Sequence, residues 1–100
     1  MLTRSDVITS LKENSDRFQK EFHIRKMGLF GSFSRNQQTD QSDIDLIIEL
    51  EANTPDIFET KQQLRAYLSK LFSRNIDLAS YRYLKPYAQR EIFNEVEPIV

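Results

Sequence analysis

The spacing of apolar residues predicts a helix and then a strand in the first third of the chain. Over residues 5–22 the apolar positions recur at helical spacing and share one stripe, as in an amphipathic helix. Thr3 or Ser5 can cap the start of this helix. The segment over residues 24–30 is short, and its last residues are mostly apolar, which predicts a strand that runs into Gly31. We expect a short helical turn directly after it.

The clearest strand is predicted over residues 42–50, where polar and apolar residues alternate. Ile44, Leu46, Ile48 and Leu50 fall on one face of it, and the acidic residues fall on the other. A helix is expected next, with Thr54 as its cap and Pro55 in its first turn, and it should run to about residue 72. A strand over 75–79 and a last helix from Lys85-Pro86 complete the expected elements.

The predicted order of elements is helix, strand, strand, helix, strand, helix. This order is typical of a small α/β or α+β domain in which helices pack on a small mixed sheet. The length of 100 residues fits one domain over residues 1–100. No repeat, low-complexity tract or linker divides the chain.

Composition excludes several classes of function and of binding site. The formal net charge of −1 argues against a nucleic-acid binder that needs a broad basic surface. The chain has no cysteine, which excludes disulfides, thiol catalysis and cysteine-bound zinc, and its one histidine, His23, cannot form a multi-histidine metal site. No apolar run approaches the ~20 residues of a membrane span, and the start of the chain is unlike a signal peptide. We therefore expect a cytoplasmic protein.

Three aspartates are the candidate chemical groups. Asp43 and Asp45 are two residues apart in a predicted strand, so their side chains project to the same side. Neighbouring carboxylates repel, and a divalent cation such as Mg²⁺ relieves that repulsion. If the strand that carries Asp77 lies beside them, the acids can hold two metal ions for phosphoryl or nucleotidyl transfer, and Asp77 can assist an attacking hydroxyl. Each acid alone is also compatible with an ordinary exposed position.

Both glycines of the chain, Gly28 and Gly31, lie just before these acids. Gly31 has no side chain, so a phosphate can approach its backbone closely. Ser32 adds a hydroxyl, and free amides at the start of a helix there favour an anion. Arg35, one turn further on, is either a phosphate contact or a surface charge. Ser42 either caps a turn or steadies the first acid.

Together these motifs resemble the DNA polymerase β-like nucleotidyltransferase superfamily. Gly31-Ser32, ten intervening residues and Asp43-Ile44-Asp45 match its Gly-Ser-x10-Asp-x-Asp signature. The short length, the Ser-Asp-Ile-Asp-Leu string and the later Ile-Asp-Leu are similar to the minimal nucleotidyltransferase (MNT) proteins. The resemblance extends over nearly the whole chain.

The resemblance implies an activity and a partner that composition does not show. MNT proteins often pair with a HEPN-domain RNase toxin, as antitoxins that transfer AMP from ATP to a tyrosine of the toxin. The same resemblance implies that Gly31 and Ser32 bind the nucleotide phosphates, and that Asp43, Asp45 and Asp77 are catalytic acids that bind Mg²⁺. A hetero-oligomer with the toxin is expected on this basis.

One position departs from the family pattern. A small residue, arginine and glycine often follow the Gly-Ser-x motif, whereas this chain has Ser34-Arg35-Asn36. Asparagine tolerates left-handed backbone angles better than most residues, so the loop is expected to keep its shape.

Two other functions fit parts of the same pattern. A non-catalytic antitoxin would neutralise its partner by contact, with an idle site. A nucleotidyltransferase that acts on a small molecule, such as an antibiotic, would share the motifs, although such relatives usually carry an additional substrate domain. Template-directed polymerisation is disfavoured by the size and the charge of the chain.

Overall fold

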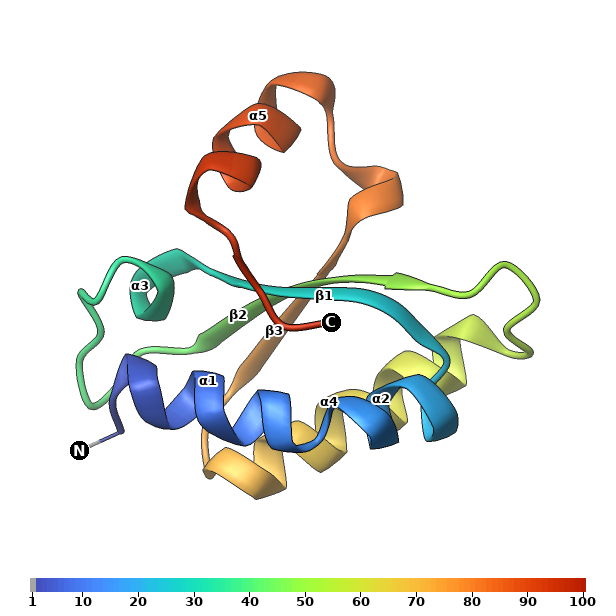
Figure 1. Cartoon of the computed structure of the whole chain (residues 1–100), viewed down its shortest axis with the longest axis horizontal. Helices are drawn as coiled ribbons and strands as arrows, with labels where there is room; N and C mark the ends of the chain where they lie inside the picture. Colours follow the sequence, from blue (N-terminus) through green and yellow to red (C-terminus); the bar gives the residue numbers. More distant parts are fainter. Residues whose placement is uncertain (1) are drawn as a thin grey trace.

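A four-stranded mixed sheet forms the centre of the molecule (Figure 1). The computed structural model describes residues 2–100, apart from the side chains of Glu91 and Phe93. The strand order is β3-β2-β1-β4. β1 pairs antiparallel with β2 and with β4, whereas β2 and β3 are parallel. The strands are β1 (Ile24–Phe30), β2 (Ile44–Leu50), β3 (Ile76–Ser80) and β4 (Glu97–Pro98).

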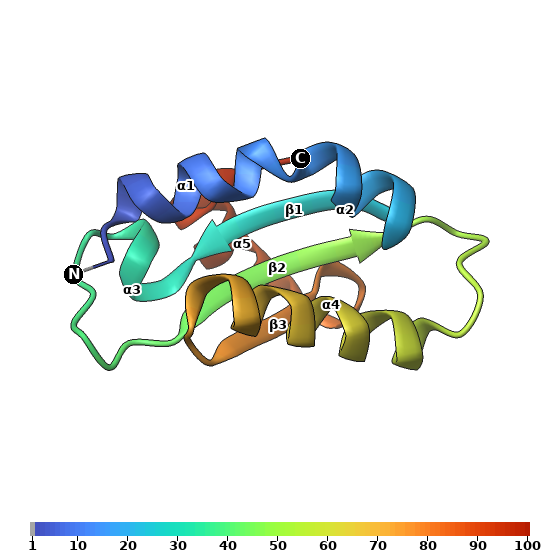
Figure 2. The same cartoon turned by 90° about the horizontal axis from the view of Figure 1, so that it is seen from below.

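Helices lie on both sides of this sheet. Figure 1 shows α1, α2 and α4 below it and α5 above it, and Figure 2 shows α1 and α2 along the β1 side and α4 along the β3 side. The predicted fold class, helices packed on a small mixed sheet, is confirmed. The helices are α1 (Arg4–Glu13), α2 (Ser15–Glu21), α3 (Gly31–Ser34), α4 (Ile57–Phe72), the 3-10 helix η1 (Tyr81–Tyr83) and α5 (Pro86–Glu95). None of the helices within residues 2–100 is both long and apolar enough to cross a membrane.

The main core lies between the sheet and the lower helices. Ile44, Leu46 and Ile48 of β2 are at most 1% exposed, and Leu64 and Leu68 of α4 are fully buried. The alternation predicted for β2 is therefore confirmed, because Ile44, Leu46 and Ile48 face the lower helices and the acidic positions face away, on the same side as Ile47.

The first helix is interrupted, although a continuous helix was predicted over residues 5–22. Asn14 separates α1 from α2, and its side-chain amide donates to the carbonyl of Ser10 at 2.7 Å. Its oxygen accepts a hydrogen bond from the Tyr67 hydroxyl at 2.6 Å. A side chain that bonds the backbone one turn earlier competes with the helical ladder. Thr3, one of the two predicted caps, does cap α1.

α4 begins later than predicted. Its cap is Asp56, whose carboxylate accepts from the backbone N–H of Glu59 at 3.1 Å. Thr54 instead donates its hydroxyl to the carbonyl of Glu51 at 2.7 Å and closes the preceding turn. The prediction of Thr54 as the cap and Pro55 in the first turn was wrong, since the local turn holds the threonine hydroxyl.

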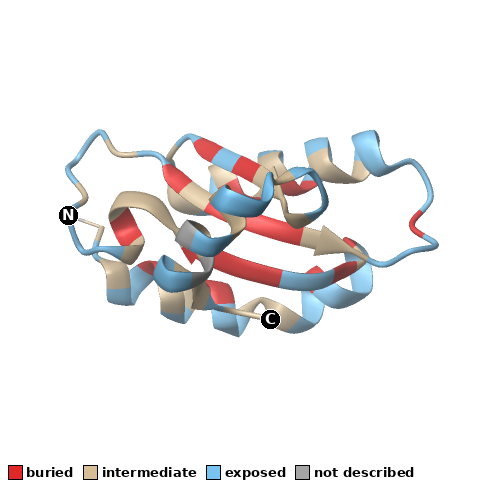
Figure 3. Cartoon of the chain, turned by 90° about the horizontal axis from the view of Figure 1, so that it is seen from above, coloured by how far each residue is buried: buried red, intermediate tan, exposed pale blue. Residues whose placement is uncertain are grey.

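The C-terminal part of the chain covers much of the upper face of the sheet. Ile47, on the face opposite the main core, is fully buried. A Cβ atom at Gly28 would lie 2.4 Å from Val96 and 3.3 Å from the Tyr81 hydroxyl. Gly28 therefore lets these two side chains lie directly on β1. Figure 3, seen from above, shows buried residues along the strands beneath α5. The short β4 that anchors this segment was not predicted.

Candidate functional site

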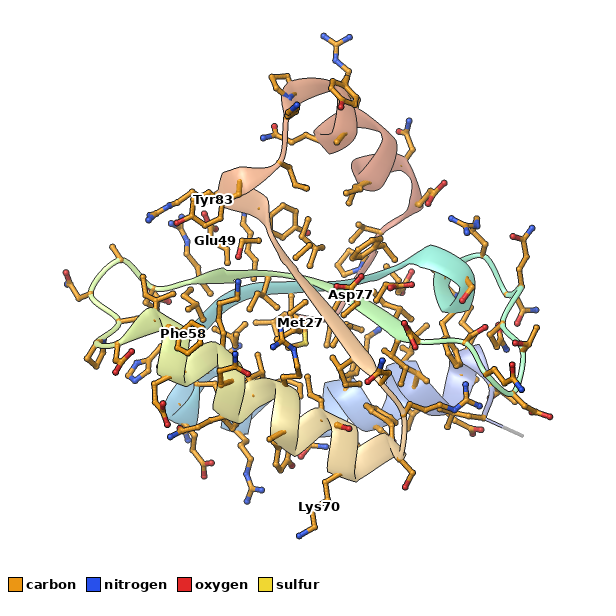
Figure 4. The ribbon with its side chains drawn as sticks, turned by 180° about the vertical axis from the view of Figure 1, so that it is seen from behind. Met27, Glu49, Phe58, Lys70, Asp77 and Tyr83 are labelled. Atoms are coloured by element: carbon orange, nitrogen blue, oxygen red, sulfur yellow. The ribbon has the colours of Figure 1, made fainter. Side chains whose placement is uncertain are left out.

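The predicted acids meet near the start of β2 and β3. Parallel pairing sets Asp45 directly beside Asp77, and the antiparallel pairing sets Asp45 opposite Phe30. Asp43 precedes β2 and is exposed. Figure 4 shows Asp77 on β3, between α4 below and α5 above. The sheet register thus brings together carboxylates that are 32 residues apart in the chain.

The pKa of Asp45 is raised above its usual value of 3.8. Burial is the largest cause, followed by the negative charges of Asp77 and Asp43, and a hydrogen bond with Asp77 adds to the effect. The positive charge of Arg35 opposes it. The negative charges of Asp77 and Asp43 repel a charge on Asp45, and a cation among the three carboxylates would relieve that repulsion.

The acids offer oxygen ligands without enclosing an ion by themselves. Within the described residues, no three acidic or histidine side chains are grouped so as to hold a metal ion. Asp45 interacts most strongly with Asp77, whereas Asp43 acts on it through charge. Mg²⁺ fits such a partial set, because it binds through one or two carboxylates and takes its other oxygens from water and phosphate.

Gly31 is required here by its backbone conformation and by the space it leaves. Its φ of +74° lies in the left-handed region that glycine adopts most readily. A Cβ atom at this position would lie 2.1 Å from Oδ2 of Asp45, far inside contact distance. The absence of a side chain at Gly31 therefore sets how closely the α3 turn approaches the acidic cluster.

The α3 turn closes on itself beside the acids. The N–H of Arg35 donates to the carbonyl of Gly31 at 3.2 Å, and the N–H of Gln37 donates to the carbonyl of Ser32 at 2.9 Å. The N-cap residue, Phe30, provides no side-chain hydrogen bond to the first amides. Asn36 has a φ of +58°, so asparagine adopts the left-handed conformation expected of it.

Arg35 is held at the edge of this turn. Its Nη1 atom lies 3.0 Å from Oε2 of Glu95, and its Nε donates to Oε1 of Gln37 at 3.2 Å. Its charge is close enough to Asp45 to lower the pKa of that carboxyl. Arg35 therefore faces the site while one side of its guanidinium is tied to the end of α5.

Ser42 belongs to a turn that leads into β2. Its hydroxyl accepts from the N–H of Thr39 at 2.8 Å, and its own N–H donates to the Thr39 carbonyl at 3.2 Å. Arg74 donates to the carbonyls of Ser42 and Thr39 at 2.8 and 3.1 Å and stacks against Phe33. Ser42 was considered either as a turn cap or as a support for the first acid, and its hydrogen bonds are those of the turn. Arg74, which sequence reasoning missed, fixes the approach to Asp43.

The two ends of the chain also hold the α3 turn. Arg4 donates to the carbonyl of Ser34 at 3.1 Å and forms an ion pair with Glu97 at 3.3 Å. The Ser34 hydroxyl donates to the backbone carbonyl of Glu95. Sequence reasoning missed Arg4 and Glu95, because their contacts join residues 30 to 93 positions apart and leave no local pattern.

Comparison with known proteins identifies the family of this chain. The model of the nucleotidyltransferase domain family matches residues 8–99. The protein adenylyltransferase MntA of Thermococcus cleftensis is 27% identical over 96 residues, which span 96% of this chain and 95% of that protein. The chain therefore belongs to the nucleotidyltransferase domain family, and the predicted family and enzyme class are confirmed.

Solved structures share the fold. A protein provisionally described as a minimal nucleotidyltransferase superposes with a TM-score of 0.80 at 21% identity, over 97% of this chain and 96% of that chain. A chain from the complex of the tri-AMPylated Shewanella oneidensis HEPN toxin with its MNT antitoxin superposes with a TM-score of 0.64 at 17% identity, over 93% and 71% of the two chains. At these identities the likeness shows the same fold.

Proposed function

We propose that this protein is a Mg²⁺-dependent protein adenylyltransferase. It would transfer AMP from ATP to a hydroxyl, a tyrosine by preference, of a partner HEPN-domain toxin, and so act as the antitoxin. The observation that carries this proposal is the position of Asp45, which lies beside Asp77 and against the backbone of Gly31. That arrangement sets a pair of carboxylates next to a turn that a phosphate chain can approach.

Each residue of the site has a role in this proposal. Asp43 and Asp45 would bind magnesium, Gly31 and Ser32 would hold the β- and γ-phosphates, and Asp77 would orient the acceptor hydroxyl and accept its proton. The bound ions would supply charge neutralisation at the phosphates. The new bond joins the acceptor oxygen to the α-phosphorus of ATP, and the bond that breaks releases pyrophosphate. The rate enhancement would come mainly from positioning and electrostatic stabilisation.

Two further residues are proposed to contact the nucleotide. Arg35 has its Nη1 and Nε bound to Glu95 and Gln37, and a guanidinium carries further N–H groups that can donate to a phosphate oxygen. Ser42 would act indirectly, because its turn sets the position of the first acid. The protein would work in the cytoplasm. The complex of the MNT antitoxin with the tri-AMPylated Shewanella oneidensis HEPN toxin supports an antitoxin that acts while bound to its toxin.

The test is transfer of label from ATP to the product of the gene next to that of this chain, which we expect to be the HEPN-domain partner. Adenylyl transfer predicts that label from the α-phosphate appears on the partner with added Mg²⁺, and that label from the γ-phosphate does not. Asp45→Asn should abolish the transfer, whereas Asp40→Asn, an exposed acid in the neighbouring loop, should retain it. A partner that binds equally well to the wild type and to Asp45→Asn, and never gains label, would identify a contact inhibitor instead.

A further inference from the structure

β3 forms an open edge of the sheet. Within residues 2–100 it has one strand neighbour, β2. The opposite side of the sheet is closed by β4 and by the bond from the N–H of Ile99 to the carbonyl of Met27 at 2.8 Å. An unpaired edge presents N–H and C=O groups that can pair with another chain. An extended polypeptide can therefore be added along β3.

The hydrogen-bond pattern determines which groups of β3 face outward. The N–H of Ile44 donates to the carbonyl of Asn75 at 3.0 Å. In a parallel ladder successive residues alternate between the two sides of the strand, so the backbone groups of Asp77 are directed toward β2. The residues whose backbone groups are directed to the open edge are Ile76, Leu78 and Ser80.

The open edge carries one of the candidate catalytic acids. Asp77 is exposed on β3 and lies in register with Asp45. Residues directly opposite each other on paired strands project to the same face of a sheet. A hydroxyl-bearing residue placed opposite Asp77 on an added strand would therefore be presented to the acids.

A small hollow with both apolar and charged walls lies where β3 leaves the sheet. Its walls come from the end of β2, the turn that follows it, the start of α4 and η1, and they include the apolar Ile57 and Tyr83 and the charged Glu49, Glu51 and Arg82. Tyr83 is 78% exposed and Ile57 is 44% exposed. Figure 4 shows Tyr83 and Glu49 close together at that end of the molecule, away from Asp77. About four residues of strand, at ~3.3 Å each, lead from Asp77 to this end.

The charges along the open edge of β3 determine which kind of polypeptide can pair with it. Two copies of β3 paired edge to edge would double the negative charge along this edge, and like charges on paired strands are destabilising. Asp43 and Asp45 add to the negative charge at that end. At the other end Lys61 donates to the Ser80 hydroxyl at 3.1 Å. These charges disfavour a second copy and favour a segment without acidic residues beside its hydroxyl.

We propose that an extended segment of the acceptor protein pairs with the open edge of β3. Its modified hydroxyl residue lies opposite Asp77, and an apolar side chain about four positions away fills the hollow beside Tyr83. This inference rests on the proposed protein adenylylation and specifies how the acceptor binds. Before it binds, the acceptor segment has no strand partner of its own. It also has no acidic residue near the hydroxyl.

The first test is amide exchange with a synthetic peptide, Lys-Leu-Thr-Thr-Thr-Tyr-Thr-Thr-Thr-Leu-Lys, as the probe. Its leucines flank the tyrosine at the required spacing in both strand directions. The expected result is slower exchange at the outward amides of Ile76, Leu78 and Ser80 when the peptide is present in excess. The same peptide with alternate backbone nitrogens methylated should give no protection, because it cannot complete the ladder.

The second test uses a variant that removes an outward donor. Ser80→Pro deletes the outward N–H at the last residue of β3, and its ring also requires the φ angle of this residue to shift from −110° toward about −65°. Ser80→Ala is the matched control, since it also loses the bond to Lys61 but keeps the N–H. With both variants folded and binding ATP alike, Ser80→Pro should transfer AMP to the HEPN-domain partner roughly 10-fold more slowly, the effect of about 1.4 kcal/mol.

The outcomes separate this inference from the proposed function. Transfer at equal rates by the two Ser80 variants, with no protection of β3 by the peptide, would overturn edge pairing and leave adenylylation intact. Protection of β3 that depends on the concentration of the chain itself would identify a second copy as the occupant and also overturn it. If no AMP reaches any acceptor, the proposed function fails, and exchange at β3 in the complex with the partner still decides whether the edge is covered.

Discussion

At the scale of single residues, substitution of the two glycines distinguishes an effect on AMP transfer from an effect on stability. Gly31→Ala would place a Cβ atom on Oδ2 of Asp45 at a positive φ, so the acid must move. We expect a loss of about 1–3 kcal/mol of stability from backbone strain. We also expect AMP transfer to fall about 100-fold or more, as for a misplaced catalytic group.

Gly28→Ala is the matched control for this prediction. Its Cβ atom would meet Val96 and the Tyr81 hydroxyl, away from the acids. Thermal unfolding should show that it is destabilised, while the folded fraction should transfer AMP at nearly the wild-type rate. Equal activity losses in the two variants would mean that the contact between Gly31 and Asp45 has no special importance.

Asp45 gives the site a defined pH dependence. Because its pKa is raised in the folded protein, the unfolded chain ionises first as pH rises above the usual value of 3.8. The contribution of Asp45 to the stability of the wild type therefore falls as pH rises from that value through the folded pKa. Asp45→Asn removes the ionisation, so it should raise Tm at pH 7, and the gain should disappear below pH 3.8. The gain should be modest, because the carboxyl is partly exposed to solvent.

Differential scanning calorimetry of both proteins across this pH range checks the prediction. Mg²⁺ should raise the Tm of the wild type at pH 7 and leave Asp45→Asn unchanged. A stabilisation of Asp45→Asn that is the same at pH 3 and pH 7 would show that the asparagine acts through packing and not through charge.

At the scale of elements, the end of α5 contacts the α3 turn through Glu95 and Arg35. This ion pair is 41% and 44% exposed at its two side chains, so it should contribute no more than about 1 kcal/mol to stability. Arg35→Gln should weaken ATP binding by about 10-fold or more, because a charged hydrogen bond to phosphate is lost. Glu95→Gln breaks the same ion pair and should change ATP affinity by less than about threefold.

Calorimetric titration of ATP into both variants distinguishes these roles. If Glu95→Gln weakens binding as much as Arg35→Gln, the carboxylate positions the guanidinium and the ion pair itself is required. If neither variant changes ATP affinity, Arg35 is a surface charge.

The elements that the sequence predicts best are those with a strong local pattern. β2 has alternate apolar residues that face the helices below it, and the structure confirms this. The break at Asn14 depends on Tyr67, which lies 53 residues away, so no local signal marks it. Leu71 lies at helical spacing from the buried Leu64 and Leu68 and is nevertheless 42% exposed, because it lies in the last turn of α4. β4 is too short to have a period of its own.

At the scale of the whole molecule, the candidate site is predictable because its parts are near one another in sequence. Gly31, Asp43 and Asp45 fall within one stretch, and the strand pattern places the acids on one side. The position of Asp77 requires the parallel pairing of β2 and β3, which the order of elements only suggests. The contacts of Arg4 and Arg74 depend on the packed chain, so the sequence does not reveal them.

The whole molecule is a small scaffold with its chemistry at one edge. The lower helices bury the main core, the C-terminal segment covers part of the upper face, and the acids lie near the open edge of β3. In the proposed function the acceptor belongs to another protein. Activity should therefore be seen on a partner protein and should depend on the acids of this chain.

The most direct measurement is the intact mass of the product of the neighbouring gene, the expected HEPN-domain partner, after co-expression with the wild type or with Asp43→Asn. The account predicts that the mass increases by one or more AMP units with the wild type and is unchanged with the variant. A partner of unmodified mass that co-purifies equally with both chains would contradict it, and would show that neutralisation proceeds by binding alone.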